Sequence, residues 1–374
     1  MLKITSQEYY NKVLGSWLGR ISGDHVGAPV EFMPSFDIKN KYGEITYYPE
    51  PIDLNYVNDD EMYEICALIA LEKNGIDMTS KHIAQEWIDL LYKFNFTAEK
   101  VALKNLRSGI WPPESGIHEN VYHDAIGAQM RADIWGQISP GCPEIAKEYA
   151  KIDGCISHAG IGIQGEVFIA ILISQAFFNS DITENIQFAL RLMPSESESS
   201  YTQMVLSARE IYEQYSNDFR KARRKLVKYW RQILNDELIP AVPPKSKQRL
   251  SFLTEYIPEV HTPDVHVLPN IGIIILSLLF GGDDKEDPLG KSICIAAMMG
   301  FDTDCNCGNI GAIIGAQLGA DKIPSKWKDP LQDTFSTYVK GHEKWKISQL
   351  AQRIADIGKL VTKNKCQNKV TINE

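Results

Sequence analysis

The stretch GFDTDCNCGNIGAIIGAQLG, residues 300–319, joins an acidic turn to a run of small residues. Asp302 and Asp304 lie in the turn, and the apolar residues that follow predict a helix over 308–318. Glycines recur in this stretch at 308, 311, 315 and 319. Because glycine has no side chain, these positions allow another backbone to approach closely. The stretch therefore predicts a buried helix with an acidic turn at its start.

Helical periodicity dominates the rest of the chain. Thr5 and Glu8 have capping-box spacing, and apolar residues three or four apart predict a helix over 6–22, which the following glycines end. Further helices are predicted at about 59–74, 80–94, 100–107, 143–152, 164–179, 183–193, 200–214, 217–235, 270–281, 290–299 and 346–362. Alternation typical of strands is confined to 44–48 and 369–372. The pattern predicts an all-α protein with one domain over residues 1–374.

Composition excludes several classes of protein. The chain has 39 Lys+Arg and 48 Asp+Glu, a formal net charge of −9, and 44% hydrophobic residues, which is typical of a globular protein. The acidic balance makes nucleic acid an unlikely partner. The longest apolar runs, 167–178 and 271–280, are shorter than the roughly 20 residues of a membrane helix. Seven cysteines without a CxxC pair, and no apolar leader, predict a soluble, cytoplasmic protein with reduced thiols. The sequence does not indicate the oligomeric state.

Two acidic clusters begin predicted helices. Asn58-Asp59-Asp60-Glu61 is the first, and the turn at 302–306 is the second. Either cluster alone is explained by helix capping, since Asn58 and Glu61 have capping-box spacing and acids favour a helix N-terminus. Together they favour a cation site, because carboxylate oxygens suit hard ions such as Mg²⁺, Mn²⁺ or Ca²⁺. Two such turns that face each other could hold a pair of ions.

Two other patterns have simpler explanations. Residues 218–231 hold seven basic side chains, which could bind RNA or a membrane, but apolar positions at Leu226, Val227 and Trp230 favour an amphipathic surface helix. GIGIQG at 160–165 matches a nucleotide-loop pattern, yet no strand is predicted before it. It is better explained as the turn into the helix at 164–179.

The order and spacing of several motifs resemble the ADP-ribosylglycohydrolase family. They are GRISGDHVGAPVEF at 19–32, the Asp59-Asp60 pair, GAQMR at 127–131, Ser157-His158, and GFDTDCN at 300–306 followed by the glycine-rich helix. The likeness extends over residues 15–319. It implies an all-α fold with a central cleft that holds two divalent cations, Mg²⁺ or Mn²⁺. It also implies hydrolysis of the glycosidic bond between an ADP-ribosyl group and a protein side chain or small molecule.

The resemblance also implies roles for individual residues. The metal ligands would be Asn58, Asp59, Asp60, Asp302, Asp304 and Cys305. Catalytic residues would be Glu31, Asp60 and Asp304, and the substrate would be bound by Gly127, Met130, Arg131 and His158.

The chain departs from the family pattern at three places. Relatives have Ser or Thr where Asn58 stands and Thr where Cys305 stands, and they have a Gly/Ser/Asn-rich loop where this chain has Glu119 and Asp124. The acidic loop favours an alternative substrate, a small N-riboside or nucleoside-like compound, because carboxylates repel a pyrophosphate. A non-catalytic protein that binds ADP-ribose or has a structural role is the third possibility.

Overall fold

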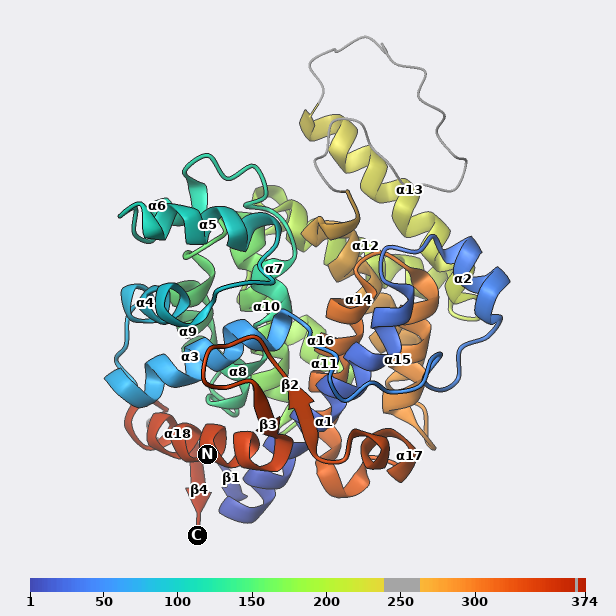
Figure 1. Ribbon diagram of the computed structural model, residues 1–374. Coiled ribbons are helices and arrows are strands. Elements are labelled where there is room, and N and C mark those ends of the chain that lie inside the picture. Colours follow the sequence, from blue (N-terminus) through green and yellow to red (C-terminus); the bar gives the residue numbers. More distant parts are fainter. Residues whose placement is uncertain (239–262, 367–368) are drawn as a thin grey trace.

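The computed structural model describes residues 1–238, 263–366 and 369–374 (Figure 1). Helices form most of this part of the chain, so the all-α prediction is confirmed. The α-helices are α1 (Ser6–Gly27), α2 (Ser35–Tyr42), α3 (Asp60–Asn74), α4 (Ser80–Leu90), α5 (Thr97–Arg107), α6 (Glu114–Ile117), α7 (Gly127–Met130), α8 (Asp133–Gln137), α9 (Pro143–Gly154), α10 (Ile161–Ala176), α11 (Ile182–Arg191), α12 (Ser200–Tyr215), α13 (Phe219–Leu238), α14 (Val267–Gly281), α15 (Pro288–Met299), α16 (Thr303–Leu318), α17 (Ser325–Lys328) and α18 (Ile347–Lys365).

Short strands lie at the edges of the fold. They are β1 (Leu2–Thr5), β2 (Thr334–Ser336), β3 (Lys344–Lys346) and β4 (Val370–Asn373). β1 and β4 pair in parallel and bring the two ends of the chain together (Figure 1). β4 confirms the strand predicted at 369–372. The strand predicted at 44–48 is wrong, because this segment forms bends and loop that follow α2.

Helices α1 and α16 pack backbone against backbone at the centre of the fold (Figure 1). A Cβ atom added at Gly19 would lie 2.0 Å from the carbonyl oxygen of Gly311, and one added at Gly15 would lie 2.5 Å from that of Gly315. The prediction that glycines end the first helix near residue 22 is therefore wrong. The helix continues to Gly27, since its glycines serve close helix packing rather than termination.

The close packing of α1 and α16 predicts a large cost for a small substitution. Gly311→Ala should destabilise the protein by about 3 kcal/mol or more, because the new methyl group would meet backbone atoms that have no room to move. Denaturant unfolding measures this. Gly43→Ala is the comparison: it has a positive φ of 67° but open space around it, so backbone strain alone should cost about 1–3 kcal/mol, without the added clash. Equal losses in the two variants would contradict the packing argument.

Two further expectations are tested by the described residues. Leu226, Val227 and Trp230 of α13 are buried, which confirms the predicted apolar face of the basic helix. Among the described residues, no helix has the length and apolar character that a membrane crossing requires. The expectation of entirely reduced thiols is wrong for one pair, because Cys142 and Cys366 form a disulfide that joins the start of α9 to the end of α18.

The antiparallel contact between α1 and α16 positions the acidic turns. Gly15 meets Gly315, and Gly27 meets Thr303, so the end of α1 lies beside the start of α16. Arg20 of α1 also reaches the first turn of α3 through Asp60. The loop after α1, the start of α3 and the start of α16 therefore converge on one region.

Candidate functional site

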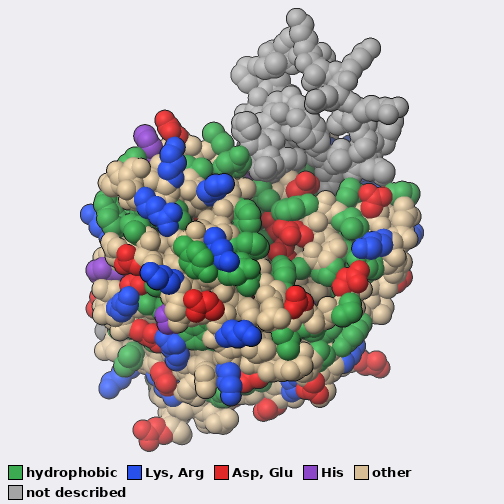
Figure 2. Space-filling model, viewed as in Figure 1, with side chains coloured by type: hydrophobic (Ala, Val, Ile, Leu, Met, Phe, Trp, Pro, Cys, Tyr) green, Lys and Arg blue, Asp and Glu red, His purple; other side chains and the backbone are tan. Residues whose placement is uncertain are grey.

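A cavity of about 470 Å³ lies where these three segments meet. Its lining includes eight of the predicted site residues: Glu31, Asn58, Asp59, Gly127, Met130, Asp302, Asp304 and Cys305. The other lining residues are Phe32, Tyr56, Phe94, Phe96, Thr97, Glu99, Ile126 and Val265. On the face shown in Figure 2, acidic and hydrophobic side chains meet near the middle of the molecule. The structure thus gathers residues that are up to 274 positions apart, from Glu31 to Cys305, around one space (305 − 31 = 274).

The turn at the start of α16 presents its acids to this cavity. Asp302 is the N-cap residue, yet its side chain accepts no capping hydrogen bond. Ligand atoms of Asp302, Asp304 and Cys305 lie within 4.8 Å of one another, and all three residues are buried. Asp304 Oδ1 has no hydrogen-bond partner among the described residues. Helix capping therefore does not explain this cluster.

The first turn of α3 is organised differently. Asp59 is the N-cap residue of α3, and its side chain also makes no capping hydrogen bond. Asn58 Oδ1 accepts only a long bond, 3.5 Å, from the Asp60 backbone N–H. The alternative explanation, a capping box of Asn58 and Glu61, does not hold, because Glu61 accepts a hydrogen bond from Nε of Arg20 at 3.0 Å instead. Asn58 and Asp59 remain available to the cavity.

A buried ion-pair network underlies the cavity. The guanidinium of Arg20, which is fully buried, donates to Asp60 Oδ2 at 2.8 Å and to Asp133 Oδ2 at 2.6 Å. The same group lies 3.0 Å from Glu61 and 3.4 Å from Glu64. One cation thus compensates four buried carboxylates, which leaves a surplus of negative charge beneath the site. Such a surplus is costly unless protons or further cations balance it.

The pKa directions reflect this crowding. Burial raises the pKa of Asp302, and the neighbouring Asp304 raises it further. The pKa of Asp304 is raised chiefly by burial, and that of Asp59 by burial and then by Asp60. Glu31 is exposed at the cavity mouth, but desolvation of its carboxyl, followed by the charges of Asp304 and Asp60, raises its pKa to about 9. Carboxyl groups whose pKa is raised by burial and by one another are suited to bind a divalent cation, which would displace their protons.

Cys305 takes a different part in the site. Its thiol donates to Asp60 Oδ1 at 3.4 Å and lies 3.8 Å from the sulfur of Met130. Burial, followed by the charges of Asp302 and Asp60, raises the pKa of this thiol well above its usual value. A protonated thiol is a poor ligand for Mg²⁺ or Mn²⁺. In this arrangement Cys305 orients Asp60 rather than offering a thiolate.

The raised pKa values predict how stability depends on pH. Because the folded chain holds protons on Glu31, Asp302 and Asp304 that the unfolded chain releases near pH 4, the Tm of chelator-treated protein should fall as pH rises from about 4 toward 9. Saturating Mn²⁺ should reduce this fall, since the ion compensates the carboxylates; at 100 times Kd the gain is about 2.7 kcal/mol. Scanning calorimetry between pH 5 and 8.5 measures both. A Tm of the metal-free protein that rises over this range would contradict the assignment.

Three predicted site residues do not line the cavity. Asp60 lies behind it, held by Arg20 and Cys305. Arg131, which is fully buried, donates to Glu99 Oε1 at 2.7 Å and to Asp153 Oδ2 at 3.0 Å. His158 is buried with Nδ1 2.8 Å from the hydroxyl of Ser157. Direct substrate contact by Arg131 and His158 is not what the structure shows, because both side chains are part of a buried polar network.

Glu99 of α5 is an acidic lining residue that the sequence did not reveal. Its carboxylate takes the hydrogen bond from Arg131 and lies against Gly127, where an added Cβ would be 2.0 Å from Glu99 Oε1. Gly127 therefore leaves room for a carboxylate. The glycine was visible in the sequence, but nothing near it indicated that an acid 28 positions earlier would fill the space (127 − 99 = 28).

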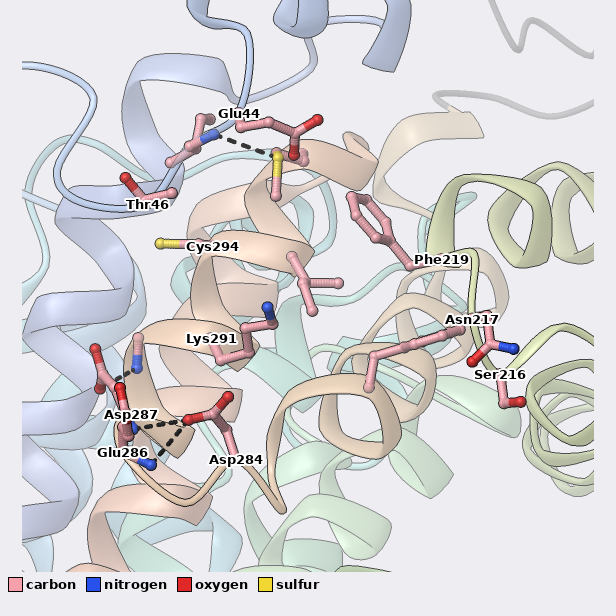
Figure 3. A pocket seen from close by; sticks show the side chains of 15 residues that line it. Glu44, Thr46, Ser216, Asn217, Phe219, Asp284, Glu286, Asp287, Lys291 and Cys294 are labelled. Atoms are coloured by element: carbon pink, nitrogen blue, oxygen red, sulfur yellow. Dashed lines mark hydrogen bonds between the residues drawn. The ribbon is translucent and has the colours of Figure 1, made fainter.

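A second cavity, of about 370 Å³, lies beside α15 and the turn between α12 and α13 (Figure 3). It is also acidic, but Asp284 and Asp287 have partners. Asp284 accepts hydrogen bonds from the backbone N–H groups of Glu286 and Asp287, both at 3.0 Å, as Figure 3 shows. Asp287 accepts from the indole of Trp327 at 2.8 Å and pairs with Lys326. These acids stabilise a loop, and the first cavity is the stronger candidate for a functional site.

Comparison with known proteins identifies the family to which this chain belongs. The profile of the ADP-ribosylglycohydrolase family matches residues 5–364, so the chain belongs to that family, which is one of glycohydrolases. An uncharacterised protein of Archaeoglobus fulgidus is 24% identical over 324 residues, which cover 84% of this chain and 90% of that protein. A solved structure described as an ADP-ribosylglycohydrolase-related protein complex superposes with a TM-score of 0.56 at 17% identity, covering 94% of this chain and 99% of that one. The latter likeness supports the fold.

Proposed function

We propose that this protein is a metal-dependent hydrolase that cleaves the glycosidic bond of an ADP-ribosyl group attached to a protein side chain or a small molecule. The observation that carries the proposal is the convergence of Glu31, Asp59, Asp302 and Asp304 on one cavity. Among the described residues no Lys or Arg lines this cavity, so its carboxylates lack a cation on that side. Membership of a glycohydrolase family supports the reaction class.

Two divalent cations, Mg²⁺ or Mn²⁺, would be held by oxygen atoms of the two acidic turns. Asp59 and Asn58 are placed to serve from the start of α3, and Asp302 and Asp304 from the start of α16. The unpartnered Oδ1 of Asp304 supports this assignment. When bound, the cations supply Lewis acidity that orients ribose hydroxyls and lowers the pKa of water. Asp60 supports the site from behind, where the thiol of Cys305 orients it.

The chain's own carboxylates then perform the proton transfers. Asp304 accepts a proton from the water whose oxygen forms the new bond to the anomeric carbon. The bond to the leaving atom breaks, its electron pair departs with that atom, and one proton is delivered to it. Glu31, at the cavity mouth, is placed to deliver this proton and to orient the substrate. Nearby carboxylates stabilise the positive charge that develops on the sugar ring.

A small N-riboside without a pyrophosphate is the second candidate substrate. It is favoured by the acidic lining of the cavity. Among the described residues, no Lys or Arg of this lining is available to bind a phosphate. The expectation that Asp124 itself would repel a pyrophosphate is not supported, because Asp124 turns to His266, with its Oδ2 3.5 Å from Nε2, and lies outside the cavity lining.

Calorimetric binding measurements with Mg²⁺ or Mn²⁺, each with and without ADP-ribose, separate the candidates. The proposal predicts ADP-ribose binding that requires metal. Metal binding without ADP-ribose binding would indicate the small-riboside substrate. Binding of neither would contradict the proposal and indicate a structural role.

A further inference from the structure

Three phenylalanine rings line the candidate site together with its carboxylates. Phe32, Phe94 and Phe96, which we call the aromatic rim, are 46%, 38% and 48% exposed, although apolar residues of this size are usually buried. They come from two distant segments, the loop after α1 and the loop before α5. An exposed apolar surface beside a polar cavity is typical of a ligand-binding site.

The rim is held in a fixed and unusual backbone conformation. Phe32 has a φ of 54° and Phe94 a φ of 64°, in the left-handed region that side chains other than glycine rarely adopt. Thr97, another lining residue, has a φ of 34°. The backbone N–H of Phe32 donates to the carbonyl of Phe301 at 3.0 Å, which holds the backbone that carries the first ring. Such conformations concentrate at ligand sites, where the surrounding structure maintains them.

Neighbouring aromatic residues support the other two rings. The centroids of Phe94 and Phe96 are 5.0 Å apart in an edge-to-face arrangement, and Phe94 packs in the same way on Tyr338 at 5.4 Å. The ammonium group of Lys93 covers the Tyr338 ring at 3.6 Å from its centroid. The rim is therefore preorganised, so that binding a ligand there requires little further ordering.

The remaining lining indicates what kind of group the rim accepts. Ile126 and Val265 add apolar surface and are joined by a 2.8 Å backbone hydrogen bond from the N–H of Ile126. The acidic residues of the cavity lining disfavour an anion. Phenyl faces stack well on flat rings, and a negative field favours a ring that is neutral or positively charged.

We propose that the aromatic rim binds the leaving group, and that this group is a flat, nitrogen-linked heteroaromatic ring. This inference rests on the proposed function and specifies its substrate class. In the reaction, the bond between the anomeric carbon and the ring nitrogen breaks, and the ring leaves with the electron pair. A bond from the anomeric carbon to the oxygen of water forms, and one proton of that water stays on the new hydroxyl group. The other proton passes to the leaving ring when the bound ring was neutral, and to solvent when the bound ring was cationic, as in nicotinamide riboside. A guanidinium is also flat and cationic and can stack on one aromatic face, but its plane is smaller than a heteroaromatic ring and would cover less of three phenylalanines.

Binding of the free heterocycle tests this without requiring turnover. Nicotinamide and adenine are titrated into the Mn²⁺-loaded full-length protein, wild type and Phe96→Leu. We expect both probes to bind the wild type, and the variant to lose about tenfold in affinity, since stacking on one aromatic side chain is worth roughly that much. Phe36→Leu is the matched control, because Phe36 is 53% exposed but lies outside the cavity lining, and its affinity should stay within about twofold.

Turnover supplies the second readout. With nicotinamide riboside as substrate, Phe96→Leu should raise KM about tenfold. The wild type should hydrolyse nicotinamide riboside faster than ADP-ribosylated arginine. Equal affinity of wild type and Phe96→Leu for both heterocycles, or faster hydrolysis of the arginine compound, would overturn the inference. Rim-dependent binding of heterocycles without hydrolysis of any riboside would uphold the rim and refute the proposed function. Hydrolysis of ribosides with the same KM in wild type and Phe96→Leu would support the proposed function and refute the role of the rim.

Discussion

Asp304→Asn is expected to reduce metal-dependent hydrolysis by about 10³-fold or more, the scale of losing a principal charged group in an active site. The substitution keeps the size of the side chain but removes a negative charge from the start of α16 and the acceptor for the proton of water. Its Oδ1 has no protein partner among the described residues, so the substitution breaks no protein hydrogen bond at that oxygen. Product release at saturating Mn²⁺ measures the loss. Asp59→Asn, on the other acidic turn, should cause a loss of similar size.

The control for these variants is Asp283→Asn, which changes an exposed acid outside the cavity. It should keep full activity. Circular dichroism should show unchanged helical content in all three proteins. If Asp304→Asn and Asp59→Asn both retained full activity, the assignment of the two acidic turns to catalysis would be wrong.

Arg20→Ala should have the largest effect on stability, a loss of about 3–5 kcal/mol in the free energy of unfolding. The arginine side chain is fully buried and lies within 3.4 Å of carboxylate oxygens of Asp60, Glu61, Glu64 and Asp133. Removing it leaves four buried acids without their cation. Burial and nearby acids already raise the pKa of Glu64, so the loss of Arg20 should also make the protein less stable at high pH than at low pH.

Arg353→Ala provides the comparison for the Arg20 variant. Arg353 also makes a two-pronged contact with an acid, Glu72, but both side chains are about one third exposed. The expected loss is below about 1 kcal/mol, because solvent screens an exposed pair. Urea unfolding curves measure both variants. A loss of less than 1 kcal/mol for Arg20→Ala would show that the buried network does not stabilise the fold.

Local patterns in the sequence predicted most of the helices. Apolar spacing located the helices from residue 6 onward, and the glycines of residues 308–319 indicated close packing before any partner was known. The partner itself was not predictable, since Gly19 and Gly23 signal a helix end as readily as a helix contact. Only the contact with α16 distinguishes the two. Short helices such as α7 and α8 were missed because they span four and five residues, too few for the apolar spacing to repeat.

The site was predictable where its residues cluster along the chain. Asp302 and Asp304 share one turn, and Asn58 and Asp59 share another, so their types and spacing indicated a cation site. Glu99 and the aromatic rim come from segments without such a pattern, and their role depends on tertiary contacts. The same holds for Arg131, whose partners Glu99 and Asp153 lie on other helices.

The most direct test of the proposed function is the rate of ribosyl-bond hydrolysis as a function of Mn²⁺ concentration in chelator-treated protein. Mono-ADP-ribosylated arginine and serine, nicotinamide riboside and free nucleosides are supplied in turn. The account predicts no hydrolysis without metal and a saturable rise with Mn²⁺ for at least one of these compounds. Hydrolysis at the same rate with and without chelator, or none of any compound at saturating Mn²⁺, would contradict it.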